Sequence, residues 1–315
     1  MRFKVVLMCC ALAAVAGGCK KKGGGGGGGW FVGEDGMMMD VSHDGTLGEG
    51  YDLGASETLN AIACRYLDEA WVAGSNGTFL QTSDAGESWE SHDLGTTADL
   101  YAMATQDAGP VYIAGDGVFF TANPDRATGA AQWTQLAEPT TNFRGLSAAQ
   151  RGTTVLAVSA DGGIWSYADG RLERRGTLAG VRAVAVSPDG TYAIAAGDGL
   201  ARSVDAGLTW TPLAVDAALR FEDVRIDHAG EALAVGTGGT VARIDLDGRV
   251  LVQRVGTANL RALHVAPSTT YSGSGFAGGD GGQTWITHDS GWTWIEGPNL
   301  GRTVLGVDEI GDGHN

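Results

Sequence analysis

Residues 82–89 read Thr-Ser-Asp-Ala-Gly-Glu-Ser-Trp, and this short stretch decides the fold. Asp84 can accept hydrogen bonds from backbone N–H groups two residues ahead, and Gly86 can adopt a positive φ without steric cost. Trp89 follows with a large apolar ring to bury. The stretch therefore predicts a tight turn between two strands, with an aromatic anchor at the start of the second strand.

The same pattern occurs twice more, because residues 203–210 read Ser-Val-Asp-Ala-Gly-Leu-Thr-Trp and residues 287–294 read Thr-His-Asp-Ser-Gly-Trp-Thr-Trp. Each copy has a hydroxyl residue, Asp, Gly and Trp at fixed offsets. We assign the pattern to Ser83, Asp84, Gly86, Trp89, Ser203, Asp205, Gly207, Trp210, Thr287, Asp289, Gly291 and Trp294.

Weaker copies between these three keep the Asp and usually the Gly. The complete set of aspartates is Asp44, Asp84, Asp125, Asp169, Asp205, Asp247 and Asp289. Successive members are 40, 41, 44, 36, 42 and 42 residues apart. A period of about 40 residues is what one propeller blade of four short strands occupies. The sequence therefore predicts an all-β fold, a seven-bladed β-propeller.

Each unit opens with a short apolar segment whose third residue is usually Ala or Gly. The clearest segments are residues 59–62, 100–103, 143–146, 181–184, 221–224 and 260–263. Small residues suit an innermost strand, because the blades crowd together at the axis. Alternating apolar residues and frequent Gly, Asn and Asp turns indicate strands throughout, and no window shows a helical period.

The two ends of the repeat region predict how the ring closes. Residues 30–33 read as the second strand of a unit, because only glycines precede them. Residues 302–307 read as a first strand with no unit after it. The two fragments complete one blade, so we expect the last strand to pair with the first unit and remove both exposed edges.

Residues 1–19 read as a lipoprotein signal peptide. Arg2 and Lys4 precede a short apolar run, and residues 15–19, Val-Ala-Gly-Gly-Cys, resemble a bacterial lipobox in which Cys19 is lipidated. The run is too short to span a bilayer as a helix. The alternative is an ordinary secretory signal with an accidental Cys.

Residues 20–29 contain three Lys and seven Gly, and they predict a flexible tether between the anchor and a propeller of residues 30–315. We therefore expect a protein of the bacterial cell envelope that is held on a membrane by lipid alone. Lys20, rather than Asp, follows the Cys, and this favours the outer membrane.

The charge of the predicted propeller excludes several classes of function. Its 16 basic residues are all Arg and face 37 acidic residues, which gives a formal net charge of −21. Such a surface repels nucleic acid and anionic lipid. No Lys follows Lys22, so a phosphate-binding P-loop lysine and a Schiff base are excluded in this region.

We expect neither a disulfide nor a cofactor. Cys64 is the only Cys of the predicted propeller, and its apolar strand indicates a buried, unreactive thiol. The six His have no metal-binding spacing, so no metal site is expected. His43 and His288 lie beside aspartates of the repeated turns and are predicted to be solvated.

The pattern Ser/Thr-x-Asp-x-Gly-x-x-Trp resembles the Asp box of BNR repeats. Together with residues 181–184, Val-Arg-Ala-Val, and residues 74–77, Gly-Ser-Asn-Gly, it resembles the repeat of the photosystem II stability and assembly factor family. The resemblance covers residues 30 to 307 and implies a seven-bladed propeller. It also implies that the Asp boxes are structural and lie on the outer rim, away from the ligand-binding face.

One set of residues is a candidate binding site. The second position of the first strand is occupied by Asn60, Tyr101, Arg144, Arg182, Glu222, Arg261 and Leu305. If these strands line the axis, the set forms a ring at one mouth of the channel. Three arginines there, with Arg220 and Arg302 close by, would form a positive patch suited to carboxylates. The alternative is that the arginines pair with Asp and Glu of neighbouring blades.

The first functional hypothesis is a monomeric, non-catalytic binding or assembly scaffold whose partner is an envelope protein or a carboxylate-bearing ligand. The second is a carbohydrate-active propeller, either a glycosidase or a lectin, since sialidases also carry Asp boxes. The Arg-Ile-Pro signature of sialidases is absent. A glycosidase of another kind needs two carboxylates at a fixed separation, so paired carboxylates in one mouth would favour it. We assign no catalytic residue.

Overall fold

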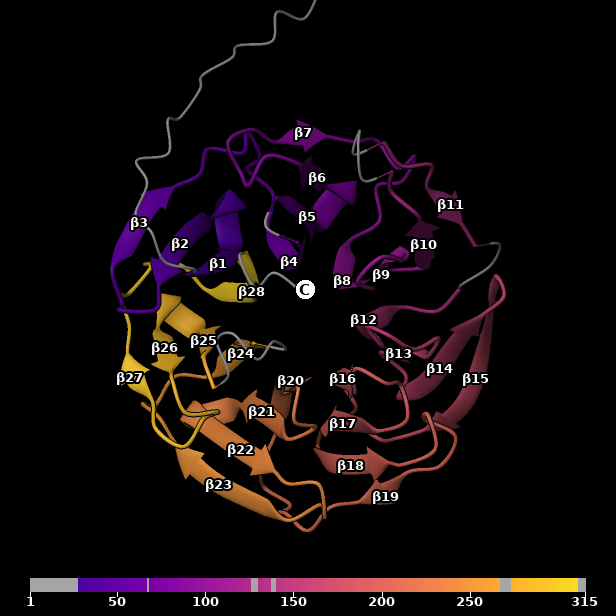
Figure 1. Cartoon of the computed structure of the whole chain (residues 1–315), viewed down its shortest axis with the longest axis vertical. Helices are drawn as coiled ribbons and strands as arrows, with labels where there is room; N and C mark the ends of the chain where they lie inside the picture. Colours follow the sequence, from indigo (N-terminus) through magenta and orange to yellow (C-terminus); the bar gives the residue numbers. More distant parts are fainter. Residues whose placement is uncertain (1–27, 67, 126–129, 137–139, 267–272, 311–315) are drawn as a thin grey trace, which may run out of the picture.

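The computed structural model of the chain describes residues 28–66, 68–125, 130–136, 140–266 and 273–310. Within these ranges, 28 strands form seven four-stranded antiparallel sheets in a ring around a central axis (Figure 1). The fold is an all-β, seven-bladed β-propeller, as the repeat period predicts.

In blades two to seven the strands pair in chain order, from the innermost strand to the outermost. Blade two contains β4 (Leu59–Arg65), β5 (Glu69–Gly74), β6 (Phe79–Thr82) and β7 (Glu90–Ser91). Blade three contains β8 (Leu100–Thr105), β9 (Val111–Gly115), β10 (Val118–Ala122) and β11 (Thr134–Gln135). Blade four contains β12 (Phe143–Ala148), β13 (Val155–Ser159), β14 (Gly163–Ala168) and β15 (Arg171–Thr177). Blade five contains β16 (Ala183–Val186), β17 (Ala193–Gly197), β18 (Gly199–Ser203) and β19 (Thr211–Pro212). Blade six contains β20 (Phe221–Ile226), β21 (Ala232–Gly236), β22 (Thr240–Ile244) and β23 (Val250–Arg254). Blade seven contains β24 (Leu260–Val265), β25 (Gly275–Gly279), β26 (Thr284–Thr287) and β27 (Ile295–Glu296).

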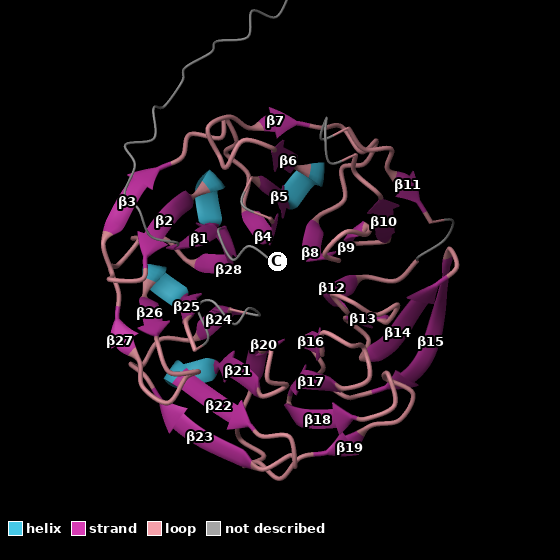
Figure 2. Ribbon diagram, viewed as in Figure 1, coloured by secondary structure: helices cyan, strands magenta, loops and turns pink. Residues whose placement is uncertain are grey.

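The helical content of the described residues consists of four 3-10 turns between second and third strands (Figure 2). They are η1 (Glu34–Gly36), η2 (Ser75–Gly77), η3 (Thr237–Gly239) and η4 (Asp280–Gly282). In the part of the chain that the structure describes, none of these helices has the length and apolar character needed to cross a membrane.

The ring has two faces, which we name by the direction of the innermost strands. The start face is the side at which the innermost strands begin, and the end face is the side at which they finish. The turns from the third to the fourth strand lie on the end face, because the strands of each blade alternate in direction. All seven repeated aspartates lie in these turns. The sequence period therefore identified the same turn in every blade.

The first blade closes the ring. It contains β28 (Val304–Ile310), β1 (Gly28–Gly33), β2 (Met38–Ser42) and β3 (Leu47–Gly50), in that order from the axis outward. In the antiparallel pair of β1 and β28, Trp30 lies opposite Asp308 and Phe31 lies opposite Val307. The C-terminal strand thus pairs with the second strand of the first blade, as predicted, and covers its inner edge.

The boundary predicted at Trp30 is wrong by two residues. Gly28 and Gly29 belong to β1 and pair with Ser42 and Val41 of β2. Gly29 is part of the strand rather than of a tether, and it is a glycine because the neighbouring blade lies close to it. A Cβ at this position would lie 2.9 Å from the ring of Phe276 in the seventh blade. The last glycines before Trp30 therefore pack in the sheet, and residues 1–27, with the predicted signal peptide, Cys19 and most of the tether, lie outside the described residues.

We expect deletion of residues 302–315 to abolish cooperative unfolding rather than to trim a tail. The deletion removes β28, and it exposes the edge of β1 together with the apolar faces of the blades on either side. The measurement is thermal unfolding followed by near-ultraviolet circular dichroism. Deletion of residues 311–315 alone is the control and should leave the transition in place; a cooperative transition in both variants would contradict the role of β28.

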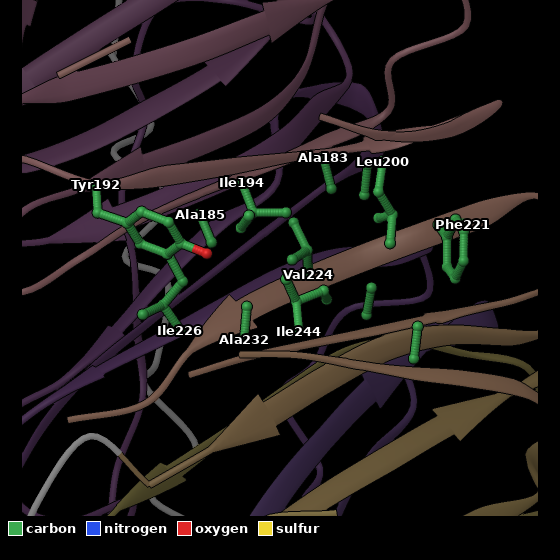
Figure 3. Packing of buried hydrophobic residues seen from close by; sticks show 13 residues of the cluster. Ala183, Ala185, Tyr192, Ile194, Leu200, Phe221, Val224, Ile226, Ala232 and Ile244 are labelled. Carbon is green, nitrogen blue, oxygen red and sulfur yellow. The ribbon is translucent and has the colours of Figure 1, made fainter. Parts of the chain in front are cut away.

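Each interface between two blades has its own apolar core. Seven clusters of buried side chains alternate with the seven blades, and each draws its members from two neighbouring sheets. Between blades five and six, Ile194 and Leu200 face Phe221 and Val224 (Figure 3). Both faces of a sheet are therefore covered, which explains why the second strands are buried along their whole length rather than at alternate positions.

Small residues let the innermost strands approach one another. A Cβ on Gly306 would lie 3.2 Å from the Cα of Ala61, and a Cβ on Gly145 would lie 3.1 Å from the Cα of Ala183. These are the predicted third positions of neighbouring blades. Asp223 is the exception, and its buried carboxylate accepts a hydrogen bond from the backbone N–H of Leu263 in the next blade at 2.9 Å.

The three strong turns share one hydrogen-bond network. In the turn of blade five, Asp205 accepts bonds from Ser203 Oγ at 2.8 Å and from the N–H and hydroxyl of Thr209 at 2.8 and 2.6 Å. Gly207 donates its N–H to Ser203 Oγ at 2.9 Å. The Asp thus bonds a residue four positions ahead, not two as predicted. In the turn of blade two the equivalent hydroxyl belongs to Thr82, which bonds Asp84 at 2.7 Å, rather than to Ser83.

The glycine of each strong turn packs on the preceding blade. Gly291 has a φ of 78°, and a Cβ there would lie 2.8 Å from Leu233 of β21. Gly86 and Gly207 face Trp30 and Leu156 of the blades before them at the same distance. The turns therefore need glycine both for the left-handed backbone and for the contact between blades.

We expect Gly291→Ala to destabilise the protein more than Gly170→Ala. Both residues have a left-handed φ, which costs a residue with a Cβ about 1–2 kcal/mol. Only at Gly291 does the new methyl meet a neighbour, and overpacking adds about 1–3 kcal/mol. Urea denaturation measures both costs, and Leu233→Ala should relieve the excess. Equal costs for the two glycines would show that the contact between blades is unimportant.

Candidate binding site at the channel mouth

The seven positions predicted to form a ring do meet at one mouth of the channel. In six innermost strands the pairing skips the second residue, which is a β-bulge. The skipped residues are Asn60, Tyr101, Arg144, Glu222, Arg261 and Leu305. In blade five, Arg182 lies just before β16 and donates its N–H to the carbonyl of Ala196 at 2.8 Å. A bulge turns a side chain away from the plane of its sheet.

All seven side chains line one cavity of about 110 Å³ at the start face. The third and fourth residues of the innermost strands form its deeper wall, with Ala61 and Gly145 among them. Tyr101, Arg144, Arg182 and Arg261 are half-buried. The structure therefore brings together the residues that the sequence singled out, and ligand binding by them stays a prediction.

The arginines of the mouth are paired with aspartates. Arg144 Nη1 lies 2.8 Å from Asp116 of the neighbouring blade. Arg182 lies 2.8 Å from Asp198, and Arg261 lies 2.5 Å from Asp280, each within its own blade. The alternative of ion pairing is thus the one observed, although the partners come from the same blade as well as from neighbouring blades. The mouth carries alternating charges rather than an isolated positive patch.

The pairs change the ionisation of their members. The hydrogen bond from Arg182 lowers the pKa of Asp198, and the bond from Arg261 lowers the pKa of Asp280. In return, Asp280 raises the pKa of Arg261. These carboxyls are therefore held as carboxylates and are poor proton donors at neutral pH.

The remaining members of the ring add different chemistry. Tyr101 lies under the guanidinium of Arg144, which is 4.1 Å from the ring centre, and burial followed by the charges of Asp116 and Asp99 raises the Tyr pKa. Glu222 lies 3.8 Å from Arg182. Asn60 donates to the carbonyl of Leu100 at 2.9 Å, which joins two blades.

The two arginines expected close to the mouth differ. Arg220 lies 3.1 Å from Asp198 and shares this carboxylate with Arg182, so it belongs to the edge of the mouth. Arg302 lies 3.5 Å from the exposed Asp35 and does not line the cavity.

The wall of the cavity contains one carboxyl with a raised pKa. Burial raises the pKa of Asp223. Its oxygens nevertheless accept bonds from the N–H groups of Val224 and Leu263 and from Arg225, which lies 2.7 Å away. This carboxyl joins two blades and has its hydrogen-bonding capacity occupied by the protein.

A buried ionic cluster lies at the opposite end of the channel. His264 Nδ1 lies 2.7 Å from Asp308, and its Nε2 lies 3.5 Å from Glu309. His43 lies 2.6 Å from Glu309. Asp308 also accepts the N–H of Cys64 at 2.8 Å. The cluster joins blades seven, one and two where the ring closes. The prediction that His43 is a solvated turn residue is therefore wrong, whereas His288 is exposed as predicted.

The cluster shifts the pKa values of its members in opposite directions. Burial alone lowers the pKa of His264, but the carboxylates of Asp308 and Glu309 outweigh burial and raise it to about 10. Burial alone raises the pKa of Glu309, but His264 and His43 lower it to about 2. Cys64 is buried and free, as predicted, and burial raises the pKa of its thiol.

We expect the stability of the protein to fall as the pH rises from 6.5 towards 10. The pKa of His264 rises from 6.5 to about 10 on folding, so its stabilisation is complete below pH 6.5 and is lost above it. The measurement is the free energy of unfolding as a function of pH. In His264→Gln the alkaline slope should be shallower, whereas the exposed His288→Gln should keep the slope of the unaltered protein. Identical slopes in both variants would contradict this account.

Sequence reasoning missed the aspartates that pair with the arginines and the cluster around His264. A signal for the aspartates existed, because Asp116, Asp198 and Asp280 each follow the glycine that ends a second strand. No local signal identified the cluster, since His43 and Glu309 are 266 residues apart. In the described residues, no three His, Cys, Asp or Glu side chains are grouped in a way that could hold a metal ion.

Comparison with known proteins supports the architecture. A scan against protein-family models and a search of curated proteins found no match. Among solved structures, YCF48 bound to a D1 peptide is 18% identical, with a TM-score of 0.60 over 79% of this chain and 83% of that chain. Sqt1 from Chaetomium thermophilum is 18% identical, with a TM-score of 0.60 over 81% of this chain and 75% of that chain. Virginiamycin B lyase from Staphylococcus aureus is 12% identical, with a TM-score of 0.61 over 77% of this chain and 84% of that chain. At these identities the likeness concerns the propeller fold.

Proposed function

We propose that this protein is a non-catalytic binding or assembly scaffold that holds a protein or peptide partner at the start-face mouth. The observation that carries the proposal is the set of bulged residues. Six blades contribute a bulged residue and blade five contributes Arg182, and all seven side chains line the same cavity. A cavity lined by one side chain from each blade offers a ligand seven separate contacts rather than a single reactive group.

The ion pairs at the mouth leave room for a carboxylate ligand. Arg144, Arg182 and Arg261 have side chains that are 33–39% exposed, and their aspartate partners are 35–41% exposed. Ion pairs at such exposure are worth about 0–1 kcal/mol, so a ligand carboxylate can replace an aspartate at little cost. A guanidinium has five N–H donors and can also bind a second carboxylate beside the first.

The choice of a peptide or protein as the partner is supported by a solved structure with a similar fold. YCF48 has been captured with a D1 peptide, and we transfer to this chain only the idea that a propeller of this kind binds a peptide. The name of virginiamycin B lyase shows that a similar scaffold can be an enzyme, which keeps a catalytic propeller as the second candidate. Asp198 and Asp280 have lowered pKa values, and Asp223, whose pKa is raised, has its oxygens bonded to Val224, Leu263 and Arg225, so these three carboxyls are poor acid catalysts for glycoside hydrolysis.

The proposal includes the lipid anchor on Cys19 and a place in the bacterial cell envelope. It rests on the lipobox-like residues 15–19 and on the tether that follows. The proposal also identifies the three strong turns as Asp boxes of BNR repeats. In this structure the glycines of these turns contact the preceding blade. The outer membrane is the proposed site, because Lys20 follows the Cys.

We expect replacement of Arg144, Arg182 and Arg261 by Ala to remove the partner. The experiment crosslinks the full-length protein in its native host and quantifies captured proteins by mass spectrometry. Recovery of the main partner should fall about tenfold or more, since hydrogen bonds to charged groups contribute about 1.5–3 kcal/mol each. Arg→Lys at the same positions should restore little, because Lys lacks the planar fork.

The matched control replaces Arg171, Arg249 and Arg254, which are exposed near the outer edge of the ring, by Ala. It makes the same change in net charge and should leave the captured partners unchanged. If the triple substitution at the mouth captures the same partners in the same amounts as the control, the mouth is not the binding site.

A further inference from the structure

Large apolar side chains are exposed on one half of the end face. Leu208, Leu246 and Trp292 are 56%, 55% and 57% exposed, and they lie in the third-to-fourth turns of blades five, six and seven. The turn itself does not require them, because blade two has Glu87 at the position that Leu208 and Trp292 occupy.

The distribution of the other exposed apolar residues follows the same division. Among the described residues, the remaining large ones all belong to blades one, five, six and seven: Leu47, Val204, Leu251, Val252 and Ile295. Blades two, three and four contribute none in the ranges that the structure describes. An apolar patch on one side of an acidic protein marks a surface that contacts something other than water.

The orientation of Trp292 is fixed by a neighbouring blade. The guanidinium of Arg243, on β22 of blade six, lies 4.0 Å from the centre of the Trp292 ring. Arg243 is itself held by Glu231 at 2.7 Å. A stacked indole that stays 57% exposed is held in place for a contact rather than free to fold back on the protein.

The position of the N-terminal end of β1 identifies the contact. Gly28 pairs with Ile310, the last residue of β28, so the chain enters the propeller at the end face. It does so in blade one, which packs against blade seven, the blade that carries Trp292. The eight residues 20–27 separate this point from Cys19. A segment of that length spans at most about 29 Å when extended, and about 16 Å as a flexible coil.

We propose that the apolar half of the end face, formed by Leu208, Leu246 and Trp292, rests on the lipid bilayer that holds the Cys19 anchor. This inference depends on the proposed lipid anchor. A short tether at the end face brings that face to the membrane, and Trp and Leu side chains are favoured at headgroup depth. The start-face mouth then points away from the membrane and is open to partners. The net acidic charge favours zwitterionic over anionic lipid.

Spin labels on the full-length, lipidated protein test this orientation. The protein is produced in a host that acylates lipoproteins and is reconstituted into phosphatidylcholine vesicles. In the mature chain Cys19 is blocked by acylation and Cys64 is buried, so a thiol-reactive label reacts with an introduced Cys alone. The labelled variants are Leu208→Cys and Leu246→Cys. The controls are Glu87→Cys, in the same turn of blade two, and Thr97→Cys, at the start face.

The measured quantity is the access of each label to oxygen relative to a water-soluble nickel chelate. We expect this ratio to be several-fold higher at 208 and 246 than at 97, with 87 close to 97. In the Leu208→Cys protein, Trp292→Glu, which copies the residue of blade two, combined with Leu246→Glu should return the ratio at 208 to the value at 97. The protein should remain on the vesicles, since its acyl chains are intact.

The outcomes separate the two proposals. Equal ratios at 97, 208 and 246 in acylated protein overturn the orientation and leave the scaffold function standing. Exclusion of nickel at 208 that is equally strong in unacylated protein at high concentration, without vesicles or detergent, assigns the patch to a second copy of the chain and overturns the bilayer contact. A mature protein whose mass lacks the acyl chains overturns the anchor, and with it this inference, whereas partner capture at the mouth is tested independently.

Discussion

The structure depends on the fact that no blade can bury its own apolar surface. Each sheet is apolar on both faces, and only the two neighbouring sheets cover it. A row of such sheets would always leave two apolar faces in water, so the row has to close. Closure is made by one pairing between the last strand and the first, and the buried cluster of His264, Asp308, Glu309 and His43 lies beside it. Without any disulfide among the described residues, the ring is held by packing and by this junction.

The mouth follows from the same geometry. Innermost strands crowd at the axis, so small residues such as Gly145 and Gly306 occupy the third position and touch the next blade. The residue before each of them bulges out of the ladder and turns towards the cavity. Farther from the axis, on the end face, the three strong turns also place a glycine against the preceding blade. Packing at the axis and at the turns therefore leaves the bulged positions as the places where side-chain identity is free to vary.

Much of this architecture could be predicted from the sequence, because repeated local signals carry it. The spacing of Asp44, Asp84 and the five later aspartates gave the number of blades and the turn they occupy, and the partial units at the two ends gave the closure. The ring at the mouth was also predicted, since equivalent positions in a repeat must be equivalent around the axis. The spacing of the aspartates can be read from the sequence without knowing which distant residues touch, and this is why it was enough to predict the number of blades.

The parts that could not be predicted depend on such contacts. Asp198 and Asp280 were missed as partners of the arginines, although each follows the glycine that ends a second strand, because the sequence does not show that this turn and the start of the innermost strand meet at the same mouth. His43 was assigned to solvent because its partner Glu309 lies at the other end of the chain. Gly29 was assigned to a tether because nothing near it in sequence shows that Phe276 covers it. The bulges themselves have no sequence signature here beyond the small residue that follows.

The bulges have a consequence for how recognition by this protein can diversify. Each of the seven cavity-lining residues belongs to a different blade, and six of them are skipped in the strand pairing. Exchanging one of these six therefore changes a single sector of the cavity while leaving the strand pairing of the ring intact. Duplicated copies of such a gene could therefore acquire new specificities through isolated replacements, without the compensating changes that a site built from paired strand positions would demand.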